Sequence, residues 1–150
     1  RKARRMRKVV GGGMRQAGIL AANQRDLAAA EATGRVETLW GRPRLLPELQ
    51  HPNRAVRENA KRVAINSRIQ GSAADIVKVA MLRVDAALRA EGRRSRMLLQ
   101  GHDELVLEVA PGEADAVEAL VRREMGAAVE LTVPLDVSVG TGRTWEDAGH

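Results

Sequence analysis

The chain has 150 residues, of which 44% are hydrophobic, so it is long enough for one ordinary domain with a buried core. It contains no cysteine, which excludes disulfides, a thiol nucleophile and a cysteine-ligated zinc site. Trp40 and Trp145 are its only aromatic residues, so base stacking on Phe or Tyr is excluded as well. The sequence shows neither a membrane span nor a secretory signal, and we expect a cytoplasmic protein without a membrane partner.

Charge is divided unevenly along the chain. Residues 1–100 carry 22 Lys or Arg against 8 Asp or Glu, whereas residues 101–150 carry 3 against 11. A basic surface suits a polyanion, and an acidic segment suits cations. A second explanation stays open, because Arg outnumbers Lys 21 to 4 and Ala is abundant, as a GC-rich genome produces.

The first 34 residues differ in composition from the rest. They are basic at the start and Ala-rich afterwards, and the stretch 16–32 favours a helix without a clear apolar stripe. We expect this segment, 1–34, to be weakly specified and disordered at its start. The pattern sharpens at residue 35, where we place the start of the main domain, 35–150.

The predicted elements of the main domain follow one another closely. Residues 36–40 suit a short strand or turn entry, and Asn53 suits the N-cap of a helix that ends near residue 66. Ser72 and Asp75 resemble a capping box, which predicts a second, central helix over 73–91. The remaining predictions are strands at 96–100 and 104–109, an amphipathic helix at 113–127, and a strand at 133–139. This order indicates an α+β fold with helices packed on an antiparallel sheet.

The two central strands are joined by a short turn that contains Gly101, His102 and Asp103, and Glu104 begins the second strand. Carboxylates at a hairpin tip are good ligands for Mg²⁺, which prefers hard oxygen donors. Beside a basic half-chain, Asp103 and Glu104 indicate a metal that acts on phosphate esters. Solvated turn carboxylates remain the alternative, because turns favour Asp in any case.

Four segments together resemble one family. The hairpin resembles motif C of the bacterial DNA polymerase I-type (family A) DNA polymerases, and three further motifs of that family occur in the same order. The four segments read VETLWGR at 36–42, QGSAADI at 70–76, MLLQGHDELVLEV at 97–109 and VPLDVSVGTGRTW at 133–145. The resemblance therefore implies the C-terminal palm region of such a polymerase.

The resemblance implies roles for the hairpin residues. Asp103 would be one of the two carboxylates that hold paired Mg²⁺ ions, and Glu104 would support that catalytic site. His102 would hydrogen-bond near the primer terminus. The implied partners are primer-template DNA and, in the complete enzyme, deoxynucleoside triphosphates, and we expect a monomer.

A second group of implied residues is predicted to bind DNA. In the family, an Arg, an Asn and a Gln spaced four residues apart face the minor groove, and here they are Arg62, Asn66 and Gln70. Spacing of four places such residues on one helical face. Their donors can reach the minor-groove acceptors that all base pairs share. A solvated helix face is the alternative for these three residues.

The family pattern is incomplete in this sequence. Motif A, which supplies the second aspartate, and motif B, which grips the incoming nucleotide, are both absent, and residues 1–34 do not resemble the family. Asp136 is a poor substitute, because alternation along its predicted strand turns it to solvent. We therefore expect a partial palm that does not polymerise by itself, as a truncated gene or a frame change near Gly34 would produce. The alternatives are a basic, non-catalytic DNA-binding remnant and a remnant that does not fold stably.

Overall fold

The computed structural model describes residues 5–11, 27–101, 104–131 and 135–149 of the chain. These residues divide between two compact units. The sheet unit comprises residues 1–14 and 76–150, and the ribbon unit comprises residues 15–75. Among the described residues, no helix is both long enough and apolar enough to cross a membrane.

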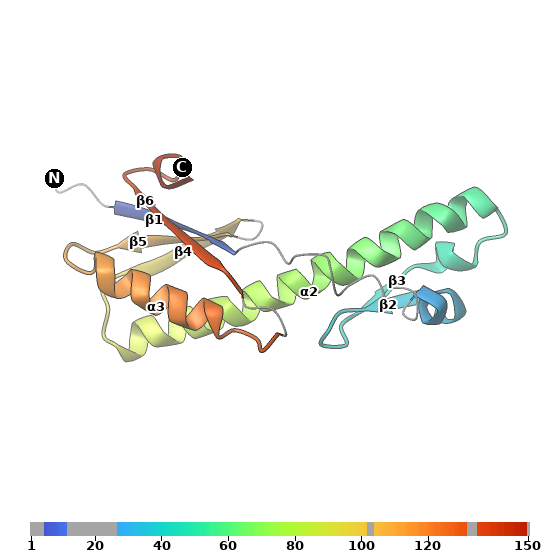
Figure 1. Ribbon diagram of the computed structural model, residues 1–150, viewed down its shortest axis with the longest axis horizontal. Helices are drawn as coiled ribbons and strands as arrows, with labels where there is room; N and C mark the ends of the chain where they lie inside the picture. The colour runs from blue at the N-terminus through green and yellow to red at the C-terminus, as the bar shows by residue number, and fades with distance from the viewer. Residues whose placement is uncertain (1–4, 12–26, 102–103, 132–134, 150) are drawn as a thin grey trace. The chain divides into compact units, whose positions relative to one another are not determined.

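The sheet unit contains a four-stranded antiparallel sheet in the order β4-β5-β1-β6 (Figure 1). Its strands are β1 (Arg5–Gly11), β4 (Arg96–Gly101), β5 (Glu104–Val109) and β6 (Val137–Gly142). Helix α3 (Ala114–Gly126) lies between β5 and β6 in the chain, and a short 3-10 turn, η3 (Asp147–Gly149), follows β6. The predicted α+β class and the predicted hairpin at 96–109 are confirmed.

Two features of this sheet differ from the sequence prediction. No strand was predicted within residues 1–34, yet β1 pairs with β5 on one side and with β6 on the other. Such pairing is long-range, so it leaves no local signal in the sequence. The last strand begins at Val137 instead of residue 133, while residues 132–134 lie outside the described part of the chain. The division of the chain at residue 34 stays a prediction.

The edge strand β4 carries an irregularity. Met97 pairs with Leu107 and Leu99 pairs with Val106, so the register shifts by one residue between Met97 and Leu99. A bulge of this kind leaves one residue unpaired and increases the local twist. The adjacent side chains, Leu98 and Leu99, are exposed.

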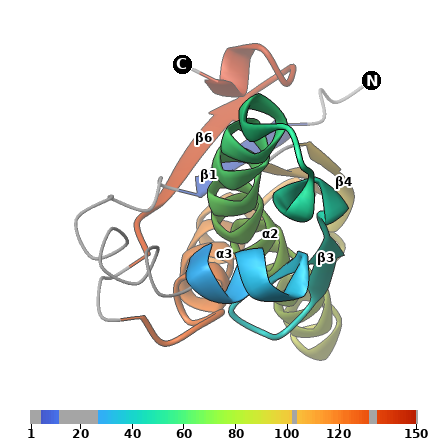
Figure 2. The same cartoon turned by 90° about the vertical axis from the view of Figure 1, so that its right-hand side faces the viewer.

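The ribbon unit is built around a two-stranded antiparallel ribbon and the start of a long helix (Figures 1 and 2). Its elements are a helical stretch at 27–33, β2 (Arg35–Glu37), β3 (Pro43–Leu45), the 3-10 helix η2 (Pro47–Gln50) and the first part of α2 (Arg54–Ala90). A small core of aliphatic side chains holds them together: Ala30, Val36, Leu46, Leu49, Ala60 and Ala64.

Helix α2 replaces the two helices that the sequence predicts over 53–66 and 73–91, so the predicted break near Gly71 is wrong. The predicted cap at Asn53 is confirmed, because its Oδ1 accepts a hydrogen bond from the Ala55 N–H at 2.8 Å. A glycine within a helix costs only about 1 kcal/mol, which neighbouring contacts can offset. Those contacts come from the loop after β2, described below.

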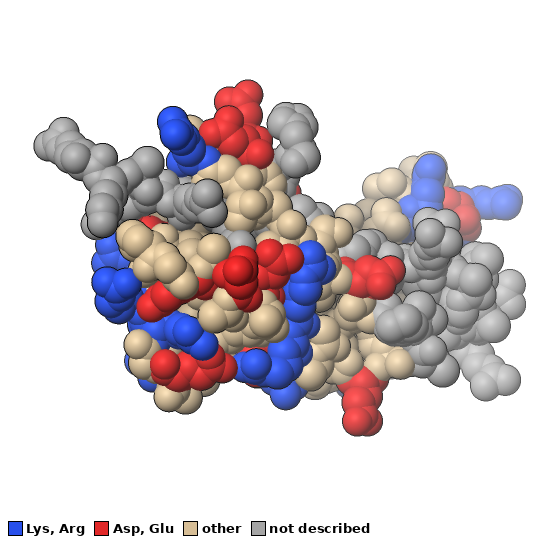
Figure 3. All heavy atoms as spheres, turned by 60° about the vertical axis from the view of Figure 1, so that its left-hand side comes forward, with Lys and Arg blue, Asp and Glu red and all other residues tan. Residues whose placement is uncertain are grey.

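The surface of the sheet unit mixes the two signs of charge. Figure 3 shows acidic and basic side chains interspersed on the face that it presents. Several acidic residues of 101–150 pair with arginines, two of which, Arg94 and Arg96, come from the basic first hundred residues. The pairs are Arg96–Glu108 at 2.8 Å, Arg122–Glu118 at 3.1 Å, Arg123–Glu124 at 2.9 Å and Arg94–Glu113 at 3.8 Å.

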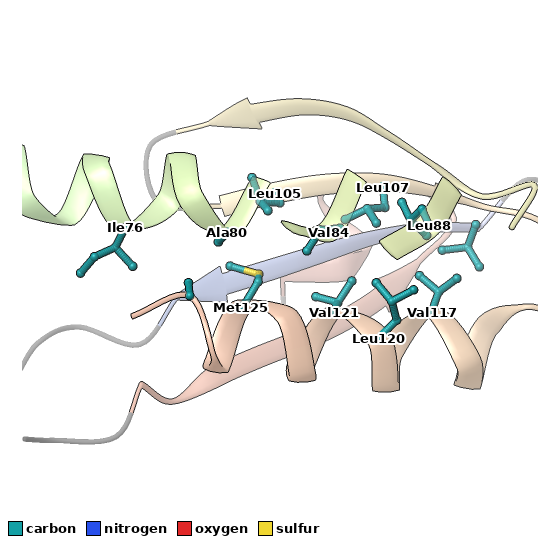
Figure 4. Packing of buried hydrophobic residues seen from close by; sticks show 12 residues of the cluster. Ile76, Ala80, Val84, Leu88, Leu105, Leu107, Val117, Leu120, Val121 and Met125 are labelled. Atoms are coloured by element: carbon teal, nitrogen blue, oxygen red, sulfur yellow. The ribbon is translucent and has the colours of Figure 1, made fainter. Parts of the chain in front are cut away.

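The core of the sheet unit lies between the helices and one face of the sheet (Figure 4). Alternate residues of β5, namely Leu105, Leu107 and Val109, are buried there, as the period of two in a strand requires. Helix α2 contributes residues four apart, and α3 contributes a second apolar stripe. These helical residues are Ile76, Ala80, Val84 and Leu88 of α2 and Val117, Leu120, Val121 and Met125 of α3.

Glu113 ties the start of α3 to the segment before β4. Its Oε2 accepts hydrogen bonds from the Ser95 hydroxyl at 2.6 Å and the Ser95 N–H at 3.0 Å, and its Oε1 accepts one from the Arg94 N–H at 3.1 Å. The Ser95 hydroxyl is the largest cause, followed by the Arg94 amide, and together with the smaller contributions they lower the pKa of Glu113 from 4.5 to about 2.

The Glu113 carboxylate should make the stability of the fold depend on pH. Because the folded-state pKa is the lower one, its contribution is complete above pH 4.5 and is lost as the pH falls toward 2. We expect the difference in melting temperature between the wild type and Glu113→Gln to shrink over that interval. Thermal melts at pH 6, 4 and about 2.5 measure it. A difference that stays constant with pH would contradict the role given to this carboxylate.

Candidate functional site

The tip of the β4–β5 hairpin is where the sequence places the catalytic residues. Gly101 and Glu104 pair across the two strands and close the hairpin. Residues 102–103 lie outside the described part of the chain, so the roles of His102 and Asp103 stay predictions. Glu104 is described: it begins β5, it is partly exposed, and its Oε2 accepts a hydrogen bond from the Trp145 Nε1–H at 3.2 Å.

Sequence reasoning missed this partnership of Trp145. The ring of Trp145 also lies beside Gly101, since a Cβ placed on that glycine would be 3.5 Å from two ring atoms. Trp145 and Glu104 are 41 positions apart in the chain, and no local pattern links residues so distant. The signal available in the sequence was composition, because the chain has only two tryptophans and an indole N–H usually finds a hydrogen-bond partner where it is buried.

The three residues predicted to face DNA lie on helix α2 in the ribbon unit. Arg62, Asn66 and Gln70 are all exposed, and their spacing of four places them on successive turns of one face. The structure thus brings these three together. Gln70 also lines a hollow of about 270 Å³ whose walls include Arg42 and Arg44.

The motif at 36–42 and the motif at 70–76 contact each other within the ribbon unit. The Leu39 N–H donates to the Ser72 hydroxyl at 3.0 Å, and the Arg42 guanidinium donates to Asp75 Oδ1 at 2.9 Å and to the Gly71 carbonyl at 3.1 Å. The prediction that Asp75 caps a helix is therefore wrong. Asp75 lies within α2 and holds the turn through Arg42.

Gly71 allows this contact because it has no side chain. A Cβ placed on Gly71 would lie 2.8 Å from the Thr38 Cγ2, closer than such atoms come in proteins. The hydroxyl of Thr38 in turn accepts a hydrogen bond from the Arg42 N–H at 3.2 Å, which closes the turn. The glycine that resembles a helix break is thus a point of close approach.

The donor set fits a divalent cation only in part. Within the described residues, His, Asp and Glu side chains form no cluster of three or more that could hold a metal. Glu104 and its sequence neighbour Asp103 supply adjacent carboxylates, which suit a cation that keeps several of its waters. Asp136 is exposed ahead of β6, as predicted.

Comparison with known proteins gives consistent matches. The sequence model of DNA polymerase family A matches residues 15–147, so the prediction that residues 1–34 do not resemble the family is wrong for residues 15–34. DNA polymerase I of Mycobacterium tuberculosis is 60% identical over 121 residues, an alignment that covers 81% of this chain and 13% of the relative. DNA polymerase I of Lactococcus lactis subsp. lactis is 46% identical over 134 residues, covering 89% of this chain and 15% of the relative.

A solved structure is also similar. It is the POL domain of Pol1 from M. smegmatis in complex with DNA primer-template and dNTP, with a TM-score of 0.83 and 53% identity, and the match covers 89% of this chain and 24% of that one. This chain therefore spans only 13% to 15% of the length of the curated relatives named above. Since the family model covers most of the 150 residues, the chain belongs to DNA polymerase family A.

Proposed function

We propose that this chain supplies the motif C part of a polymerase palm, whose parent reaction is template-directed transfer of a deoxynucleotide to a primer 3′ end in DNA replication or repair. The observation that carries the proposal is the β4–β5 hairpin, which places Glu104, next in sequence to Asp103, at its tip in a chain of this family. The similar M. smegmatis structure is described as a complex with primer-template and dNTP, which supports the same partners here.

In this proposal the hairpin carries the chemistry. Asp103 is the metal ligand, Glu104 supports it, and His102 hydrogen-bonds near the primer terminus. Mg²⁺, when bound, stabilises charge on the attacking and leaving oxygens. Family membership fits a general requirement for a divalent metal. The identity of the ion as Mg²⁺ is part of the proposal, and it follows from the carboxylate donors.

DNA would be held by the exposed face of α2. Arg62, Asn66 and Gln70 present guanidinium and amide donors on one helical face, which suits the minor-groove acceptors common to all base pairs. Arg44 lines the hollow beside Gln70 and places positive charge near that face, whereas the charge of Arg42 is paired with Asp75. Contacts of this kind test base-pair geometry without reading sequence.

The 150 residues alone are proposed to be catalytically incomplete. Stabilising both oxygens of the displacement takes a second carboxylate on a neighbouring strand. Strand β1 lies beside β5, and its sequence, RMRKVVG, contains no Asp or Glu. A cytoplasmic location and a monomeric state stay predictions.

Primer extension by the purified chain tests this proposal. With Mg²⁺ and all four deoxynucleotides, we expect no extension by the wild type or by Asp103→Ala, and a cooperative melt that shows both proteins are folded. Wild-type extension that disappears in Asp103→Ala would refute the claim of incompleteness. The readout is product length on a denaturing gel.

A second candidate, a basic DNA-binding module without chemistry, is favoured by the 22 Lys or Arg against 8 acidic residues in the first hundred positions. Phosphate binding of that type weakens steeply as salt rises. The same purified proteins discriminate the two. The module predicts equal affinity for duplex DNA in the wild type and in Asn66→Ala and Gln70→Ala, which remove no charge, whereas the palm proposal predicts weaker binding in these two variants.

A further inference from the structure

One side chain touches both ends of the hairpin tip. The Trp145 indole donates its N–H to Glu104 Oε2 at 3.2 Å, and its ring lies against Gly101, the residue that pairs with Glu104 across the two strands. Gly101 ends β4 and Glu104 begins β5, so Trp145 covers the points where the chain enters and leaves the tip.

Trp145 is itself held by the turn in which it lies. The Asp147 N–H donates to the Thr144 hydroxyl at 3.2 Å, and the Thr144 N–H donates to Asp147 Oδ2 at 3.1 Å. These bonds with Thr144 are the main cause that lowers the pKa of Asp147, so the carboxylate stays charged and keeps the turn closed at neutral pH. The residue before Trp145 and the second residue after it are thus fastened together.

The turn is also pressed onto the last strand of the sheet. A Cβ on Gly140 would overlap the carbonyl oxygen of Ala148, and one on Gly142 would overlap the side chain of Asp147. The two glycines of β6 let the backbone of the turn come close, which no residue with a side chain allows. Trp145 therefore belongs to a segment whose backbone packs directly against β6.

A fixed donor on one carboxylate oxygen restricts how the carboxylate can rotate. Outer partners of this kind orient metal-binding groups, and losing one typically weakens metal affinity about tenfold or more. Trp145 is 45% exposed, so it adds little to the buried core, and its most specific interaction is the bond to Glu104. These contacts therefore act on the orientation of the Glu104 carboxylate.

We propose that Trp145 is a positioning residue: it holds the Glu104 carboxylate in the orientation in which this carboxylate supports the binding of a divalent cation at the hairpin. This inference rests on the proposed function, because it assumes a cation at the hairpin. It assigns the segment after β6 a part in the site that the motif residues alone do not suggest.

Mn²⁺ binding to the full chain, followed by electron paramagnetic resonance, tests the inference. The proteins are the wild type, Trp145→Phe, Glu104→Ala, the double variant, and Asp103→Asn. Trp145→Phe keeps an aromatic ring but removes the N–H donor together with one ring of the indole. Trp40→Phe is the matched control, since Trp40 is 47% exposed and belongs to the ribbon unit.

The expected result is an affinity about tenfold weaker in Trp145→Phe, with a melting temperature close to that of the wild type. Glu104→Ala should lower the Mn²⁺ affinity at least as much. The double variant should bind Mn²⁺ no more weakly than Glu104→Ala, because both changes remove the same hydrogen bond. Trp40→Phe should bind as the wild type does.

Two outcomes overturn the inference, and they are distinguishable. Wild-type affinity in Trp145→Phe, with binding lost in Asp103→Asn, would reject the role of Trp145 and leave the proposed function standing. No Mn²⁺ binding by the wild type would reject both, since the hairpin would then hold no cation for Trp145 to serve. Additive losses in the double variant would also reject the inference, because Trp145 would act other than through Glu104.

Discussion

Replacing Leu107 by Ala should lower the free energy of unfolding by about 3 kcal/mol. Leu107 is fully buried on β5, between the helices and the sheet, and truncation would leave a cavity among Val84, Leu88 and the other residues of that cluster. Urea unfolding followed by circular dichroism measures the change. With marginal stabilities typical of domains, a loss of this size removes a large share of the total.

The control for this change is Leu82→Ala. Leu82 lies on α2 within the same unit but is 72% exposed, so its truncation should change the free energy of unfolding by no more than about 0.5 kcal/mol. Equal losses for the two leucines would mean that the sheet unit lacks the core described here. An unchanged slope of free energy against urea would show that both variants unfold as the wild type does.

Gly71→Ala should destabilise the chain by about 2 kcal/mol, although helix propensity alone predicts a gain of about 1 kcal/mol. The added methyl group would meet Thr38 Cγ2 at 2.8 Å and push the 36–42 turn away from α2. A loss of stability would support the steric clash with Thr38, and a gain would mean that helix propensity dominates. Thermal melts of the full chain, with the free energy compared at one temperature, measure it.

Two variants make this prediction specific. Thr38→Ser removes the clashing methyl group but keeps the hydroxyl that accepts from the Arg42 N–H, so adding it to Gly71→Ala should restore most of the stability. Gly126→Ala, at the end of α3, adds a methyl group where no atom lies within 4 Å, and it should be neutral or stabilising. Failure of Thr38→Ser to rescue Gly71→Ala would remove the steric explanation.

Local signals predicted the local parts of the fold. The hairpin at 96–109 follows from two apolar runs on either side of a Gly-containing turn, and the Asn53 cap follows from one side chain and the next residues of the helix. The helix break predicted near Gly71 is wrong, because this glycine serves a close contact with Thr38, which is distant in the chain.

The long-range pairing of β1 was not predicted either, because contacts between distant residues leave no local signal in the sequence. Strand β1 is specified by β5 and β6, which lie about a hundred residues later. The last strand was predicted to end at residue 139, whereas β6 runs on to Gly142, and its Gly140 and Gly142 allow the close approach of Ala148 and Asp147. Of the candidate site, the motif residues were predicted by resemblance, and the contact between Trp145 and Glu104 was not.

The bulge in β4 bears on how this chain behaves at high concentration. An edge strand with exposed Leu98 and Leu99 offers a template on which another chain could add a strand and begin a fibril. The register shift between Met97 and Leu99 interrupts the flat row of backbone donors and acceptors that such growth requires. The irregular strand beside the hairpin tip thus makes the β4 edge of the sheet a poor template for the addition of another strand.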